Sequence, residues 1–106
     1  MLTPEDKRIA RRLKRRLQNV SPVKRVIVFG SRARGDSTED SDLDVFIELT
    51  ELSHQLRRQI SDIAWEIGFD EGLVISTLVT TTHALVDSPL AANPILKSIQ
   101  SEGIAV

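Results

Sequence analysis

The sequence predicts an α/β (α+β) protein, in which a small mixed β-sheet has helices packed mainly on one face. Two observations carry this prediction. Apolar residues recur at helical spacing over residues 3–18, 53–68 and 93–103, and strand patterns occupy residues 23–29, 43–49, 73–80 and 104–106. With only about four strands, one face of the sheet must hold most of the helices. The 106 residues are ordinary for one domain, so we expect residues 1–106 to fold as a single unit.

The first helix is predicted to be strongly basic. Ile9, Leu13 and Leu17 recur at helical spacing, and Pro4 stands where a helix can begin. The rest of its surface carries the cations Lys7, Arg8, Arg11, Arg12, Lys14, Arg15 and Arg16. Because no aromatic residue is interleaved with them, such a face is most often solvated or turned toward a partner, and binding of nucleic acid is less favoured.

Two strands and a turn follow the first helix. The apolar run Val26–Phe29 predicts a strand buried on both faces, and this strand stops at Gly30. Residues 32–35 suit a short helical turn, and the polar residues after them form a loop. Apolar and other residues then alternate over residues 42–49, which is the period of a strand. We expect Glu48 to be exposed at the end of that strand.

The second half of the chain is also predicted to alternate between helices and strands. Ser53 is a good N-cap for a second helix, which is predicted to end at Gly68. Residues 73–80 are rich in β-branched residues and predict a third strand. A third helix is expected from Asn93–Pro94 to Gly103, and residues 104–106 are expected to add a short edge strand.

Charge is distributed unevenly along the chain. Residues 1–35 hold eleven Lys or Arg residues and two Asp or Glu residues. Residues 36–106 hold three Lys or Arg residues and thirteen Asp or Glu residues. Such an asymmetry suggests an acidic partner for one surface and cations for another. The absence of cysteine excludes disulfides, thiolate metal sites and a cysteine nucleophile, and it is compatible with a cytoplasmic protein. No apolar run approaches the roughly 18 residues that span a membrane, so we expect no membrane association.

Residues 30–44 contain the side chains that could carry chemistry. Gly30 allows a sharp turn and lets a phosphate approach without a Cβ in the way. The helical turn after it points free N–H groups at that space, and Ser31 adds a hydroxyl donor. Asp42 and Asp44 leave the same face of a strand about 7 Å apart along the chain. Two such carboxylates suit Mg²⁺, so the segment predicts a metal-assisted transfer at a phosphate.

The same segment resembles the signature of the polymerase-β-like nucleotidyltransferases, which reads Gly-Ser, ten residues, Asp-x-Asp. Gly30 and Ser31 are followed by residues 32–41 and then by Asp42 and Asp44. The flanking Arg-Ala-Arg-Gly and Ser-Asp-Leu-Asp resemble the minimal nucleotidyltransferase branch. The C-terminal stretch 94–104 is similar to the helix that closes many such proteins. The resemblance implies the polymerase-β-like nucleotidyltransferase fold.

The resemblance also implies an activity and a partner. Asp42 and Asp44 would be catalytic and would bind Mg²⁺, with two ions in the active complex, while Gly30, Ser31 and Arg34 would bind the nucleotide. A nucleoside monophosphate would pass from ATP or another NTP to an acceptor. Minimal members similar to this chain, the MntA-type antitoxins, act on a helical HEPN-type partner protein by binding it or by transferring AMP to its tyrosine. Arg34 is the better candidate for binding phosphate, and Arg32 is the weaker one. Either arginine could instead be solvated.

One departure from the family pattern concerns the third carboxylate, which active members place on the neighbouring strand. Ser76 occupies the matching position here, and Asp70 and Glu71 precede the strand. A serine is neither a base near pH 7 nor a charged ligand. The alternative function is therefore a catalytically weak nucleotide-binding module that neutralises its partner by binding alone. We expect the third carboxylate to be absent, and the competing interpretation is that Asp70 or Glu71 supplies it.

Overall fold

The computed structural model describes residues 2–106 and confirms the predicted fold class. Its elements, in chain order, are α1 (Pro4–Gln18), β1 (Val23–Phe29), α2 (Ser31–Arg34), β2 (Leu43–Leu49), α3 (His54–Glu71), β3 (Ile75–Thr81), α4 (Ala84–Asp87), the 3₁₀ helix η1 (Pro89–Ala92), α5 (Ile95–Glu102) and β4 (Ile104–Ala105). The strands form one mixed sheet in the order β3-β2-β1-β4. Strand β1 runs antiparallel to β2 and β4, and β2 runs parallel to β3.

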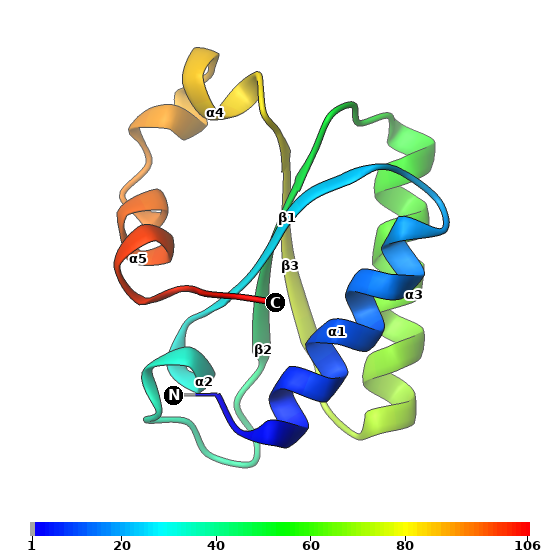
Figure 1. Cartoon of the computed structure of the whole chain (residues 1–106), viewed down its shortest axis with the longest axis vertical. Helices are drawn as coiled ribbons and strands as arrows, with labels where there is room; N and C mark the ends of the chain where they lie inside the picture. Colours follow the sequence, from blue (N-terminus) through cyan, green and yellow to red (C-terminus); the bar gives the residue numbers. More distant parts are fainter. Residues whose placement is uncertain (1) are drawn as a thin grey trace.

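The two long helices, α1 and α3, lie together on one face of the sheet, and the shorter α4, η1 and α5 lie on the other (Figure 1). The main core fills the space between the long helices and the sheet. Its fully buried side chains include Ile9, Leu13, Leu17, Val26, Val28, Leu43, Val45, Ile47, Leu49, Ile60 and Ile67. These are the positions that helical and strand periodicity single out, which is why the elements of this layer could be predicted.

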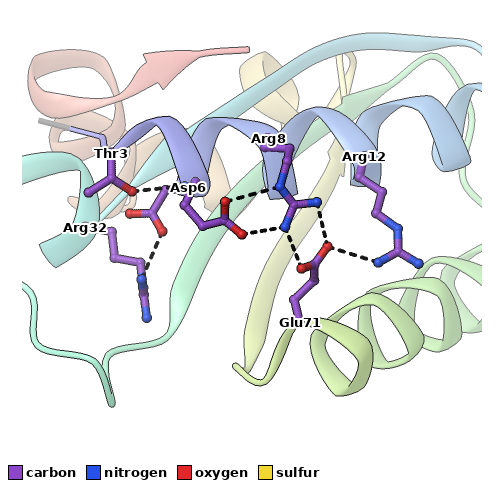
Figure 2. A network of polar contacts seen from close by, with 7 residues as sticks. Thr3, Asp6, Arg8, Arg12, Arg32 and Glu71 are labelled. Carbon is purple, nitrogen blue, oxygen red and sulfur yellow. Dashed lines mark hydrogen bonds and ion pairs between the residues drawn. The ribbon is translucent and has the colours of Figure 1, made fainter.

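The basic face of α1 meets acidic side chains of α3. Arg8 and Arg12 donate to the carboxylate of Glu71 at 2.6 and 3.1 Å (Figure 2). Arg12 also pairs with Asp70 at 2.9 Å. The hydrogen bonds from Arg8 and then from Arg12 lower the pKa of Glu71. The acidic partner suggested by the uneven charge is thus, for these two cations, the protein's own second long helix.

Helix α3 does not end at Gly68, and that prediction is wrong. Gly68 is buried inside the helix, where a Cβ would lie 2.6 Å from the carbonyl oxygen of Leu73. The helix continues to Glu71 and ends at Gly72, which has a φ of +76°. Gly68 is needed for the close approach of the following chain, and Gly72 supplies the left-handed residue that ends a helix.

Glu48 is buried rather than exposed, which corrects a second prediction. Its carboxylate accepts hydrogen bonds from Arg25 and Thr82, both at 2.6 Å. Burial by itself would raise the pKa of Glu48, but the hydrogen bonds from Thr82 and Arg25 lower it overall. The short helix α4, which the sequence did not predict, and α5 line one pocket together with Phe46 and Glu48 on this face of β2. Both faces of β2 are therefore buried, and its alternating sequence does not mark one buried and one exposed face.

An apolar surface remains on α3 and beside β3. The rings of Trp65 and Phe69 stack with their centroids 5.3 Å apart, and their exposed fractions are 68% and 74%. Val74, just before β3, is also exposed. Contiguous exposed apolar side chains of this kind are typical of protein–protein contacts. Within residues 2–106, none of the helices combines the length and apolar character needed to cross a membrane.

Candidate active site

The pairing of β1 with β2 brings the two halves of the motif together. Phe29, the last residue of β1, lies opposite Asp44 in the antiparallel register. Gly30 follows Phe29, and a Cβ added to Gly30 would overlap Oδ2 of Asp44. The backbone of the turn thus lies against the Asp44 carboxylate, so any ligand held by the turn would also be near that carboxylate.

The turn after β1 has the conformation that the sequence predicted. Gly30 has a φ of +77°, which favours glycine, and it precedes the single turn of helix α2. The carbonyl of Gly30 accepts the hydrogen bond from the Arg34 N–H at 3.0 Å, and Gly35, with a φ of +86°, ends the helix. Ser31 occupies the first helical position and is half-buried. A backbone of this shape can receive a phosphate oxygen.

Asp42 and Asp44 form a pair of interacting carboxylates. Asp42 is exposed, and Asp44 is half-buried. Burial and then the negative charge of Asp42 raise the pKa of Asp44, and the charge of Arg34 partly opposes this. Because the negative charge of Asp42 disfavours the ionised form of Asp44, a cation bound near both would relieve this repulsion.

The donor set fits Mg²⁺. That ion prefers hard oxygen ligands and is commonly held by one or two carboxylates, with water and substrate phosphate completing its shell. Asp42 and Asp44 supply two such carboxylates beside the Gly30 turn. Across residues 2–106, no three side chains of His, Cys, Asp or Glu gather into a metal cluster.

The place for a third carboxylate is occupied by Ser76. Strands β2 and β3 are parallel, and Asp44 pairs with Ser76 in their register. Both residues therefore face the same side of the sheet, as the family pattern predicted. Glu71 and Asp70, the alternative candidates for that carboxylate, pair with Arg8 and Arg12 of α1.

The two arginines of α2 have different surroundings. Arg34 is exposed and pairs with Glu102 of α5 at 3.1 Å and with Asp36 at 3.3 Å, and its charge acts on Asp44. Arg32 instead points into the protein, where it meets Asp6 and the carbonyl of Ser41. Sequence reasoning did not single out Asp6, because an acid in the first turn of a helix is usually solvated and no local pattern links it to a residue 26 positions away.

Comparison with known proteins adds a family match over most of the chain. The family described as "Nucleotidyltransferase domain" matches residues 7–103. Two curated relatives come from Methanocaldococcus jannaschii. One, named "Putative protein adenylyltransferase MJ1379", is 45% identical over 50 residues, which cover 47% of this chain and 50% of the relative. The other, "Putative protein adenylyltransferase MJ1215", is 40% identical over 53 residues, which cover 50% of this chain and 62% of the relative. The matches thus span only about half of these relatives.

Solved structures resemble the whole chain. A crystal structure of a toxin–antitoxin with AMP-PNP aligns with a TM-score of 0.61 and 17% identity, covering 97% of this chain and 72% of that one. A crystal structure of a mutant of the toxin–antitoxin MntA-HpeT aligns with a TM-score of 0.63 and 17% identity, covering 98% of this chain and 72% of that one. At this identity the likeness concerns the fold. It agrees with the expected architecture from α1 to β4.

Proposed function

Because the chain belongs to the nucleotidyltransferase domain family, we propose that it transfers a nucleoside monophosphate from ATP, or from another NTP, to an acceptor. The observation that carries this proposal is the contact between the Gly30 turn and the Asp44 carboxylate. An anion-binding turn against a carboxylate pair is the arrangement that metal-assisted transfer at phosphorus requires. In this proposal residues 1–106 act as one nucleotidyltransferase domain.

Each candidate residue has a distinct task in this reaction. Asp42 and Asp44 hold Mg²⁺, two ions in the active complex, and Gly30, which has no Cβ, lets the phosphate-binding turn lie directly against Asp44. The hydroxyl of Ser31 donates a hydrogen bond to a phosphate oxygen. Arg34 leaves its exposed ion pairs with Asp36 and Glu102 and pairs with the phosphate instead. When bound, Mg²⁺ neutralises charge on the phosphates and activates the attacking hydroxyl.

The acceptor we propose is a helical HEPN-type partner protein, which the chain neutralises as an antitoxin in the cytoplasm. Two observations support a protein acceptor. The exposed stack of Trp65 and Phe69 offers an apolar surface for a partner. The solved structures with this fold include complexes described as toxin–antitoxin.

A second candidate function is partner neutralisation by binding alone. The observation that favours it is Ser76 beside Asp44, because a serine supplies neither a charged metal ligand nor a base. The nucleotide site would then be retained while transfer is slow.

Transfer to the partner is tested directly by mass. We expect a helical HEPN-type partner protein to gain one nucleoside monophosphate when it is incubated with this protein, ATP and Mg²⁺, as measured by intact-protein mass spectrometry. EDTA in a parallel reaction is expected to prevent the gain. A stable complex whose partner never gains mass would contradict transfer and favour the binding module.

The consequence of the missing carboxylate is tested by Ser76→Asp. The new side chain would face the same side of the sheet as Asp44 and would supply a ligand and a base. We expect transfer to rise about tenfold or more, which corresponds to about 1.4 kcal/mol of barrier. The matched control Ser76→Asn has similar size without charge and is expected to leave the rate unchanged. Equal rates for both variants and the natural protein would contradict the role of position 76.

A further inference from the structure

All three nitrogen atoms of the Arg32 guanidinium group donate hydrogen bonds to other parts of the protein. Its Nη1 donates to Oδ1 of Asp6 at 2.9 Å, and its Nε and Nη2 donate to the carbonyl oxygen of Ser41 at 2.9 and 2.6 Å. Nη2 also reaches the carbonyl oxygen of Glu39 at 3.3 Å. A planar guanidinium with several donors in fixed directions is suited to hold separate acceptors in one geometry.

Asp6 holds Arg32 in this orientation. The side chains of Asp6 and Arg32 are only 6% and 11% exposed, so each carries a charge that needs its partner. The backbone N–H of Asp6 donates to the hydroxyl of Thr3, which fixes the first turn of α1 (Figure 2). The pair therefore links the start of α1 to α2, the helix that begins at the Gly30 turn.

The carbonyl that Arg32 holds belongs to the residue immediately before Asp42. Residues 36–40 are exposed, and the contact between Thr38 and Ser41 lies within the loop itself. Arg32 thus connects this loop to the body of the protein. On the other side of Asp42, the Leu43 N–H donates to the carbonyl of Val74 at 2.9 Å, which anchors the start of β2.

We propose that Asp6 and Arg32 are positioning residues that hold the Asp42 carboxylate at the metal site. Asp44 lies within β2 and is placed by the sheet, whereas Asp42 precedes the strand and depends on the peptide of Ser41. Because Arg32 lies on α2, the same side chain sets the distance between the phosphate-binding turn and the first carboxylate. This inference rests on the proposed function, since it concerns the metal that the function requires.

The test uses Arg32→Lys and Asp6→Asn in the full chain. Lysine keeps the charge but cannot hold two carbonyls and a carboxylate in one plane, and asparagine keeps the shape of Asp6 but removes its charge. We expect the Mg²⁺ concentration for half-saturation, measured by calorimetric titration with AMP-PNP, to rise about 10- to 100-fold. In the metal-free protein, NMR relaxation is expected to report greater mobility of the amides of residues 38–42.

Glu71→Gln is the matched control, because it also breaks an ion-pair network of α1 but on the side of α3 (Figure 2). We expect it to lower the melting temperature without changing the Mg²⁺ dependence or the loop amides. An unchanged Mg²⁺ dependence in folded Arg32→Lys and Asp6→Asn, or an equal change in Glu71→Gln, would overturn the inference. A natural protein that binds no Mg²⁺ with AMP-PNP would overturn the proposed function itself.

Discussion

Replacing both Asp42 and Asp44 by asparagine is expected to abolish Mg²⁺-dependent nucleotide binding and to reduce transfer by about 10³-fold or more, since a metal contributes several kcal/mol to lowering the barrier. Amides keep the shape of the carboxylates and lose the charge that a hard dication requires. Calorimetric titration of Mg²⁺ with AMP-PNP, together with the mass assay, measures both effects.

The same double variant is expected to fold at least as well as the natural protein. Burial and the charge of Asp42 raise the pKa of Asp44, which means that the folded state disfavours its ionised form. Above that pKa the charge lowers stability, so its removal should maintain or raise the melting temperature at pH 7. The control Glu39→Gln with Asp40→Asn makes the same change of charge in the neighbouring loop and should leave binding intact. Equal Mg²⁺ affinity in the folded Asp42→Asn, Asp44→Asn variant would refute the site.

Gly30→Val is expected to remove nucleotide binding and to destabilise the protein. A Cβ at this position would overlap Oδ2 of Asp44, and the φ of +77° is unfavourable for a branched residue. Such backbone strain costs of order 1–3 kcal/mol, and the displaced carboxylate would add to it. The melting temperature and the affinity for Mg²⁺ with AMP-PNP are the two measurements.

Two comparison variants separate strain from the loss of the site. Gly72 has a nearly equal φ of +76°, and a Cβ there meets no atom within 4 Å, so Gly72→Val carries the strain without the clash. We expect it to lose stability but to bind nucleotide normally. Ser31→Ala removes one hydroxyl donor, with an expected loss of about 0.5–1.5 kcal/mol in binding. If Ser31→Ala were far worse than Gly30→Val, the backbone of the turn would not be the phosphate site.

Local patterns in the sequence were enough to predict the elements that build the site. The apolar spacing of α1, the strand patterns of β1 and β2 and the Gly30-Ser31 turn all depend on residues within a few positions of each other. The alignment of Ser76 with Asp44 was also predicted, but through the family pattern rather than through periodicity. A glycine near the end of a helix can either allow close packing or end the helix. The sequence alone could not tell which of these roles belongs to Gly68 and which to Gly72.

By itself, then, the sequence determined the order of the main helices and strands, the motif from Gly30 to Asp44 and the absence of an acid at position 76. Only the tertiary structure decided that Glu48 is buried, because this depends on Arg25 of β1 and on Thr82, which follows β3. It also decided that Arg32 turns inward to Asp6 and Ser41 while Arg34 remains outside. The physical reason is that periodicity reports which face of an element is apolar, whereas the partner of a charged side chain is set by packing between segments far apart in the chain.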